Sequence, residues 1–244
     1  MVFINRPGNT VTSFSLSTDH PHSLQTVETE DGSLTLLSER FGATYHSVQG
    51  AKEESRHVFI NHGLLHFLDQ HPQKELHILE IGFGTGLNAF LTFLEAERLA
   101  LKVYYHTVEA FPVPMETVKR LNFSQGHLPL EQLVFEKMHE QAWGVEQNLS
   151  AYFYFSKHFK KIETFQLSQS VDLIYFDAFS PKEQPELWTE DVFKKMYALL
   201  TEKGMLVTYC AQGQMKRNMK AAGFRVKAMK GFAAKREMTV GYRD

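Results

Sequence analysis

The sequence contains a single cysteine, Cys210, among its 244 residues and no apolar run that approaches the roughly 20 residues of a membrane span. One cysteine excludes a disulfide within the chain and is typical of a reducing compartment. The N-terminal residues 1–6 also lack the layout of a signal peptide. We therefore expect a cytoplasmic protein that makes no contact with a membrane.

The net charge is small as well, at −2 for the whole chain, but it is unevenly distributed. Residues 201–244 carry ten lysines and arginines against three acidic residues, whereas residues 1–200 carry 16 against 25. A basic C-terminal part is typical of a surface for an anionic partner such as nucleic acid, although solvated helix and strand faces give the same count.

Residues 76–88 are the most informative stretch of the sequence. An apolar run ends in the alternating glycines Gly82, Gly84 and Gly86, and Asn88 then opens a helical pattern. Glycine allows positive φ and close approach of the backbone to a ligand, and the start of a helix carries a partial positive charge. The stretch therefore predicts a strand, a tight turn and a helix that hold a nucleotide or nucleoside. The alternative is an ordinary turn without a ligand.

Two acidic residues favour a ligand at this turn. Glu80 stands just before the glycines, and Glu109 ends the next apolar run, where Rossmann-type folds place a carboxylate on ribose hydroxyls. The cofactor contacts that we expect are Glu80, Gly82, Phe83, Gly84, Thr85, Gly86, Asn88, Glu109 and Ala110. We expect no metal site, because the spaced pair His62 and His66 has no patterned carboxylate or cysteine partner.

The rest of the pattern predicts an α/β fold with a mostly parallel sheet of seven strands. A β-hairpin around residues 31–32 and a helical segment over 51–71, broken at Gly63, precede the glycine turn. After the turn we expect strands at 103–109, 152–155, 171–177 and 204–209, with helices at 89–99, 115–123, 191–200 and 212–222. The last two strands, 224–229 and 238–242, have no helix between them and must pair antiparallel.

That ending separates two classes of fold. A parallel sheet that finishes in an antiparallel pair is typical of S-adenosylmethionine-dependent methyltransferases, whereas a nicotinamide dehydrogenase normally brings a second half or a substrate domain. We therefore predict a Rossmann-like, class I methyltransferase domain over residues 51–244, with a small β extension over residues 1–50 packed on it.

Asp177 ends the strand predicted at 171–177. Ligands of open α/β sheets lie beyond the carboxyl ends of the strands, so Asp177 should face the same crevice as the glycine turn. A carboxylate there can position a nucleophile, although acidic residues at strand ends are also common turn residues. Phe179 and Trp188 offer flat faces for stacking on a base or for simple packing, and Lys235 and Arg236 offer positive charge for phosphates.

Three segments together resemble the methyltransferase domain of bacterial MnmC-type enzymes, namely residues 80–88, 177–189 and 230–238. Residues 40–47 and 53–59 match as well, so the resemblance runs from about residue 28 to residue 242. It implies a tRNA methyltransferase that uses S-adenosylmethionine to methylate the aminomethyl nitrogen of 5-aminomethyl-(2-thio)uridine at the wobble position, with the tRNA anticodon loop as its partner.

The resemblance also implies roles for individual residues. Asp177 would be the catalytic residue, and the tRNA contacts would be Phe179, Pro181, Trp188, Phe232, Lys235 and Arg236. It implies a stand-alone enzyme without FAD, because the sequence ends where the flavin oxidase domain of the two-domain members would begin; an oxidase partner would be a separate protein. The family usually has an adenine-binding acid after its third strand, and the matching residues 155–158 contain none.

Two other functions remain open from the sequence. The same cradle would serve an N-methyltransferase or aminopropyltransferase that acts on a small-molecule amine. A non-catalytic nucleotide-binding module would keep the cradle but would not need Asp177 beside it.

Overall fold

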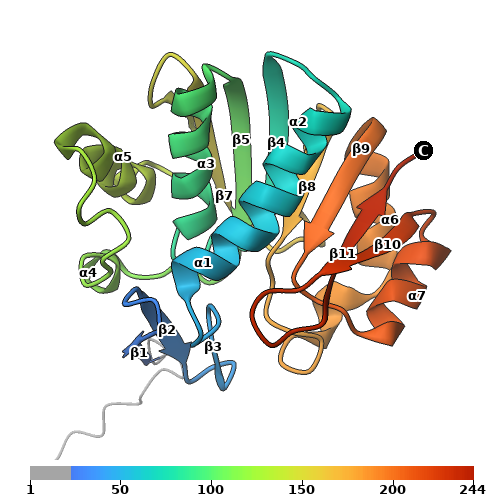
Figure 1. The fold of residues 1–244 in the computed structure, drawn as a ribbon, viewed down its shortest axis with the longest axis horizontal. Coiled ribbons are helices and arrows are strands. Elements are labelled where there is room, and N and C mark those ends of the chain that lie inside the picture. Colours follow the sequence, from blue (N-terminus) through green and yellow to red (C-terminus); the bar gives the residue numbers. More distant parts are fainter. Residues whose placement is uncertain (1–22) are drawn as a thin grey trace, which may run out of the picture.

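Within residues 23–244 the main sheet has eight strands in the order β10-β11-β9-β8-β4-β5-β7-β6, and a second sheet has three strands in the order β1-β2-β3. The structure, a computed structural model, describes residues 23–244 (Figure 1). The strands are β1 Leu24–Glu28, β2 Leu34–Ser38, β3 Ala43–Thr44, β4 Glu75–Ile81, β5 Lys102–Glu109, β6 Glu146–Asn148, β7 Phe153–Phe159, β8 Val171–Phe176, β9 Leu200–Thr208, β10 Arg225–Lys230 and β11 Glu237–Tyr242. The helices are α1 Ala51–Ser55, η1 Arg56–Leu65, α2 His66–Gln70, α3 Leu87–Leu99, α4 Met115–Val118, α5 Pro129–Glu140, η2 Pro185–Trp188, α6 Glu190–Leu199 and α7 Gly213–Ala221.

Five parallel strands, β7-β5-β4-β8-β9, form the centre of the main sheet. β11 pairs antiparallel with β9, and β10 pairs antiparallel with β11, which confirms the predicted antiparallel ending. The eighth strand, β6, was not expected, because its three residues are polar and exposed and carry no apolar pattern. The fold is thus that of a class I methyltransferase with one additional antiparallel edge strand.

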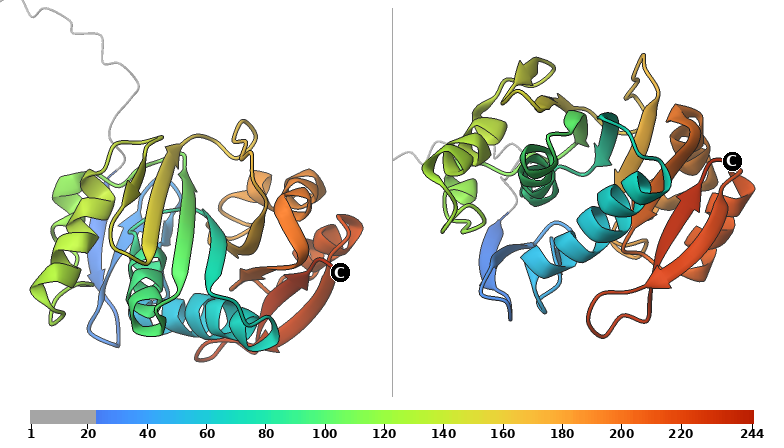
Figure 2. Two further views of the ribbon diagram at one scale, coloured as in Figure 1. Left: turned by 90° about the horizontal axis from the view of Figure 1, so that it is seen from above. Right: turned by 45° about the horizontal axis from the view of Figure 1, so that its top comes forward.

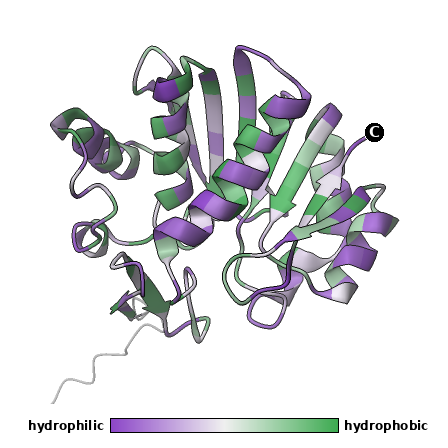
Figure 3. Ribbon diagram, in the orientation of Figure 1, coloured by the Kyte–Doolittle hydropathy of each residue, from purple (hydrophilic) through white to green (hydrophobic). Residues whose placement is uncertain are grey.

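Helices pack on the two faces of this sheet (Figures 1 and 2). The segment α1-η1-α2 and helix α3 bury one apolar cluster, to which Phe59, Phe90 and Tyr175 belong. Helices α6 and α7 bury the other cluster, which includes Phe176 and Phe193. Figure 3 shows hydrophobic residues gathered on the central strands and hydrophilic residues on the outer sides of the helices, as burial of apolar surface requires. None of the helices within residues 23–244 has the length and apolar character needed to cross a membrane.

The helical segment after residue 50 is continuous to Gln70, so the break predicted at Gly63 is wrong. Gly63 lies inside the π-helix η1, where an added Cβ would stand 3.1 Å from the Tyr175 ring and 3.2 Å from Val207. The glycine is there because the helix lies so close to the sheet. This contact seats the segment against β8 and β9 and directs its first turn toward the sheet's carboxyl edge.

Two further predictions fail between residues 115 and 159. The helix expected over 115–123 is only the four-residue α4, and α5 follows it where no helix was predicted. The third strand continues to Phe159, well past residue 155. The continuation of the strand was not predicted because it includes Lys157, and a lysine inside a buried strand is unusual. Its ammonium donates to the carbonyl oxygen of His139, and burial lowers its pKa to about 8.

The small sheet begins with the predicted hairpin, β1 and β2, around Asp31 and Gly32. Gly32 has φ +75°, and the Asp31 carboxylate accepts the backbone N–H groups of Ser33 and of Glu53 in α1. Asn122 bridges the hairpin to the main domain by accepting from Leu34 N and donating to Gly32 O. The chain that leaves this sheet, residues 45–50, is thereby brought to the edge where the central strands end.

Candidate active site

The glycine turn joins the ends of three neighbouring strands. Gly82 has φ +93°, its N–H donates to Val108 O at the end of β5, and Asp177 N donates to Ile81 O. A Cβ added at Gly82 would stand 2.5 Å from the carbonyl oxygen of Asp177, so no other residue fits there without moving β8. The turn therefore brings its own backbone and Asp177 to one point at the carboxyl edge of the sheet.

A cleft of about 310 Å³ opens at this point. Seven of the expected cofactor residues line it, namely Gly82, Phe83, Gly84, Thr85, Asn88, Glu109 and Ala110. Gly86 does not line the cleft; it lies behind the turn, where an added Cβ would meet the His139 ring at 2.6 Å. Tyr45 and Phe179 contribute aromatic walls to the cleft.

Glu109 stands at the end of β5 with its carboxylate at the cleft. Its Oε2 accepts the N–H of Gly84 at 2.9 Å and its Oε1 accepts the N–H of Phe111 at 2.7 Å. Burial raises the pKa of this carboxyl, and these backbone donors oppose the rise. A carboxylate held in this way retains lone pairs for further donors, as binding of ribose hydroxyls would require.

Glu80 is not in the cleft lining. Its side chain is fully buried on β4, and burial raises its pKa well above the ordinary value, although the nearby polar groups of Thr107 and Asn88 oppose this. Burial thus favours the protonated form of this carboxyl, which lies beneath the turn. We expected Glu80 to contact the cofactor because it stands just before the glycines. Its buried position does not support a direct contact, since a strand residue next to the turn can point into the core as well as toward the ligand.

Asp177 follows β8, and its Oδ2 accepts a hydrogen bond of 2.7 Å from Asn88 Nδ2. Burial raises the pKa of Asp177 to about 7, and the hydrogen bond from Asn88 opposes the rise. The charge of Glu54 raises this pKa further and that of Lys235 lowers it. Asp177 lines both the cleft and a second, smaller cavity of about 150 Å³, so it stands where the two meet.

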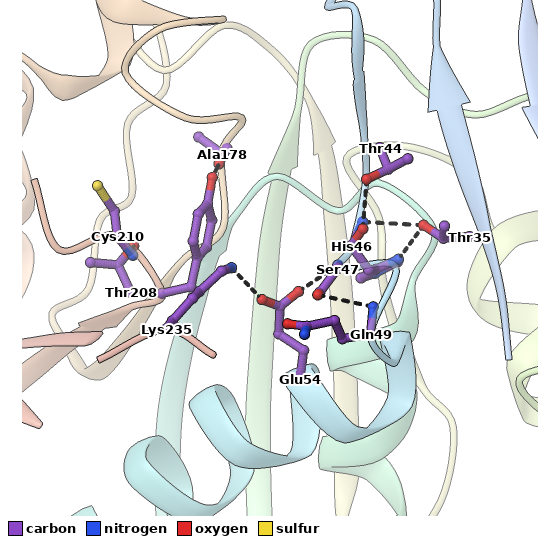
Figure 4. Close-up of polar contacts among 11 residues, drawn as sticks. Thr35, Thr44, His46, Ser47, Gln49, Glu54, Ala178, Thr208, Cys210 and Lys235 are labelled. Carbon is purple, nitrogen blue, oxygen red and sulfur yellow. Dashed lines mark hydrogen bonds and ion pairs between the residues drawn. The ribbon is translucent and has the colours of Figure 1, made fainter. Parts of the chain in front are cut away.

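The second cavity, which we call the acidic cavity, is lined by residues 44–47, Glu54, Ser55, Phe59, Asp177, Tyr209 and Lys235. Glu54, from α1, accepts Lys235 Nζ on its Oε1 at 2.6 Å and Ser47 N–H on its Oε2 at 2.7 Å (Figure 4). None of the lining residues other than Asp177 and Lys235 was singled out from the sequence as a site residue. The available signal was the match of residues 40–47 and 53–59 to the MnmC-type pattern, which carried no chemical role for them.

Two histidines support the glycine turn from below, of which His46 is buried and His139 half-buried. His46 contacts Thr35 Oγ1 through Nδ1 at 3.0 Å (Figure 4). Its Nε2 contacts Thr85 Oγ1 at 3.3 Å. His139, from the unpredicted helix α5, contacts Thr85 O through Nε2 at 3.2 Å. Burial lowers the pKa of each to about 4, so both rings are neutral at pH 7 and act as hydrogen-bonding supports.

The expected substrate residues divide into three groups. Phe179 lines the cleft and stacks on Phe41 with ring centroids 4.2 Å apart. Trp188 is only 3% exposed and packs on Phe176, so its predicted stacking on a base is corrected to core packing. Its indole N–H donates to Phe179 O, which positions the Phe179 loop.

The remaining four lie on two loops, Pro181 after β8 and the other three between β10 and β11, and neither Pro181 nor Phe232 lines either cavity. Pro181 and Phe232 are half-buried, and the Phe232 ring lies 6.0 Å from that of His57. Lys235 and Arg236 line a groove next to the acidic cavity. Arg236 is exposed there, whereas the ammonium of Lys235 turns inward to Glu54.

An acidic residue does follow the third parallel strand, contrary to expectation. Because β7 continues to Phe159, residues 155–158 lie inside the strand, and the loop that leaves it is residues 160–163. This loop lines the cleft and includes Glu163. The sequence comparison had placed the end of the strand four residues too early.

The fold, with its glycine turn, the acid at the end of β5 and Asp177 at the end of β8, defines a class I S-adenosylmethionine-dependent methyltransferase. Residues 101–244 match the family described as S-adenosyl-L-methionine-dependent methyltransferase, and the chain belongs to this family.

Within that class the chain is similar to the MnmC proteins. It is 28% identical over 217 residues to the tRNA 5-methylaminomethyl-2-thiouridine biosynthesis bifunctional protein MnmC of Leptospira interrogans, and 30% identical over 227 residues to that of Actinobacillus pleuropneumoniae. Both alignments cover 85% of this chain but only 34% and 33% of the relatives. The chain thus spans about a third of the length of the curated relatives it matches, the part that corresponds to the MnmC methyltransferase domain.

Solved structures agree on the fold. MNMC2 from Aquifex aeolicus superposes with a TM-score of 0.72 at 24% identity, over 91% of this chain and 71% of that one. Spermidine synthase from Thermotoga maritima superposes with a TM-score of 0.56 at 14% identity, over 90% and 68%.

Proposed function

We propose that this protein methylates the aminomethyl nitrogen of 5-aminomethyl-(2-thio)uridine at the wobble position of tRNA. The observation that carries the proposal is the position of Asp177, whose carboxylate stands between the glycine-lined cleft and the acidic cavity. A methyl donor in the cleft and an amine in the cavity would meet there. The similarity to MnmC proteins supports this choice of amine.

The cleft fits S-adenosylmethionine. The backbone at Gly82 and Gly84 is open to a ligand, the Glu109 carboxylate suits ribose hydroxyls, and Glu163 suits the amino group of an adenine. When bound, this cofactor supplies a methyl group on a cationic sulfur, which a neutral amine can attack. Gly86 and Glu80 would act from beneath by shaping the turn.

Asp177 would prepare the amine. An alkyl amine resembles lysine, with a pKa near 10.4, so presenting it neutral at pH 7 costs on the order of 4 kcal/mol. Asn88 holds Asp177 Oδ2, which leaves Oδ1 to accept an N–H of the amine and aim its lone pair. Because the pKa of Asp177 is about 7, its carboxylate can also take up the proton that the ammonium must lose.

The tRNA would contact the rim of the site. A wobble base lies in a single-stranded loop and can turn into a pocket without breaking a base pair. Phe179 offers a ring face at the cleft, Phe232 offers one in the loop that carries Lys235, and Arg236 offers charge for the phosphate backbone. A tRNA substrate also agrees with the expected cytoplasmic location. Of the extension expected over residues 1–50, residues 1–22 lie outside the described residues, and residues 23–50 would supply Tyr45 and His46 to the site.

The test is a methyl-transfer assay with labelled S-adenosylmethionine and tRNA that carries aminomethyluridine at the wobble position. Label should appear in this tRNA and not in a matched tRNA with uridine there. Transfer to a small diamine without tRNA would instead support the small-molecule alternative. If the protein binds the cofactor but transfers methyl groups to neither acceptor, the result would contradict an enzymatic role.

A further inference from the structure

The acidic cavity is built to hold a cation. The side chain of Glu54 is only 10% exposed, and its Oε2 is fixed by the backbone N–H of Ser47. A carboxylate buried to this degree is costly unless a cation lies next to it. Lys235 Nζ fills that place, 2.6 Å from Oε1 (Figure 4). It also lies 4.9 Å from the centre of the Tyr209 ring.

The two members of this ion pair differ in how firmly they are held. Glu54 belongs to α1 and is anchored by Ser47, and the Tyr209 hydroxyl donates to Ala178 O at 2.9 Å, so the carboxylate and the ring are fixed walls. Lys235 belongs to the loop between β10 and β11, is 43% exposed and has a flexible four-carbon stem. The cation is therefore the member that can leave.

The end of a lysine side chain is a primary alkylammonium, and so is a protonated aminomethyl group. We propose that Glu54 is the receptor for the substrate ammonium, and that this ammonium replaces Lys235 Nζ beside Glu54 and over Tyr209. In the free protein Lys235 then occupies the ammonium position and forms the ion pair with Glu54 until the substrate binds. The proposal rests on the proposed function and assigns a binding role to a residue outside the cofactor cleft.

The chemistry of the amine explains why Asp177 alone does not suffice. A neutral primary amine that points its lone pair at a methyl group has two N–H donors, and each needs an acceptor where water is excluded. Asp177 and Glu54 face the same cavity and supply two carboxylate acceptors. Methyl transfer forms the N–C bond and breaks the C–S bond of the donor, and the secondary ammonium that results has one N–H donor fewer than the substrate ammonium.

The first test needs neither tRNA nor cofactor. Lys235→Met empties the ammonium position, so ethylammonium should bind there and raise the thermal unfolding midpoint of this variant. The double variant Lys235→Met/Glu54→Gln and the control Lys227→Met, an exposed lysine of β10, should show no such increase. The proposal is overturned if ethylammonium stabilises all three proteins equally, or if it stabilises none of them.

The second test uses the affinity ratio of two tRNAs, one with aminomethyluridine and one with uridine at the wobble position. Glu54→Gln should lower this ratio about ten-fold or more, because a hydrogen bond to a charged group is lost, and should leave binding of the uridine tRNA unchanged. Lys235→Met should keep or increase the ratio. An unchanged ratio in Glu54→Gln would refute the assignment. Ethylammonium binding as predicted, without methyl transfer to tRNA, would support the amine site and reject the proposed substrate.

Discussion

Asn88 Nδ2 donates a hydrogen bond of 2.7 Å to Asp177 Oδ2, which ties the first turn of α3 to the end of β8. This bond favours the ionised form of Asp177. Asn88→Ala should therefore raise the pKa of Asp177 and shift the acidic limb of the pH profile of kcat/KM for methyl transfer to higher pH. Asn148→Ala, on the exposed strand β6, is the control and should leave the profile unchanged.

Asp177→Asn should lower kcat by roughly 10²-fold or more, because the amide neither takes up a proton nor accepts as strongly from the amine. Binding of S-adenosylmethionine, measured by calorimetry, should remain within a few-fold of wild type, since the glycine turn and Glu109 are intact. Asp191→Asn, at the exposed start of α6, serves as the matched control. Turnover of Asp177→Asn equal to wild type would remove Asp177 from the mechanism.

The raised pKa of Asp177 also makes stability depend on pH. Its pKa rises from 3.8 to about 7 on folding, so between these values the folded protein binds more protons than the unfolded one. Its contribution to stability therefore falls as the pH increases from about 4 to 7. Asp177→Asn should stabilise the protein at pH 8, by at most about 4 kcal/mol, and not at pH 4. Denaturant unfolding of both proteins at the two pH values measures this difference.

Gly82→Ala places a Cβ 2.5 Å from the carbonyl oxygen of Asp177 at φ +93°. The strain and the collision should cost several kcal/mol or displace β8, and cofactor binding should be lost. Gly126→Ala is a matched control, because Gly126 has φ +80° but no atom within 4 Å of the added Cβ. It should cost only about 1–2 kcal/mol and leave cofactor affinity unchanged. Similar losses in both variants would mean that backbone strain alone is responsible.

Arg236→Ala should weaken tRNA binding and reduce the slope of log K against log salt by about 1, as loss of one phosphate contact does. Lys235→Met should leave this slope unchanged, because the Lys235 ammonium is paired with Glu54 inside the cavity. Filter binding at several salt concentrations tests both variants. A loss of slope in Lys235→Met would restore the role in phosphate binding first expected for Lys235.

The local part of the site could be predicted from the sequence. Alternating glycines after an apolar run define a strand, a turn and a helix within 13 neighbouring residues, so Gly82 and Gly84 needed no long-range information. Glu109 and Asp177 were found because they end apolar runs, and the carboxyl ends of parallel strands meet at one edge. The antiparallel ending followed from the absence of a helical pattern between two apolar runs, and β10 and β11 confirm it.

Whatever depends on contacts between distant segments was not predictable in this way. Glu54 and Lys235 are 181 positions apart, and neither residue has a local pattern that indicates the other. Trp188 follows Asp177 closely in sequence, yet packing against Phe176 turns it into the core.

The sequence by itself determined the class of the protein, because a glycine turn, two strand-end acids and an antiparallel ending are local features that follow from backbone conformation and chain order. Only the tertiary structure decided how the site is charged. Burial raises the pKa of Asp177 and of Glu80, and the folded chain pairs Glu54 with Lys235. Desolvation and Coulomb energy depend on the distances between groups in space, and the order of residues along the chain does not contain these distances.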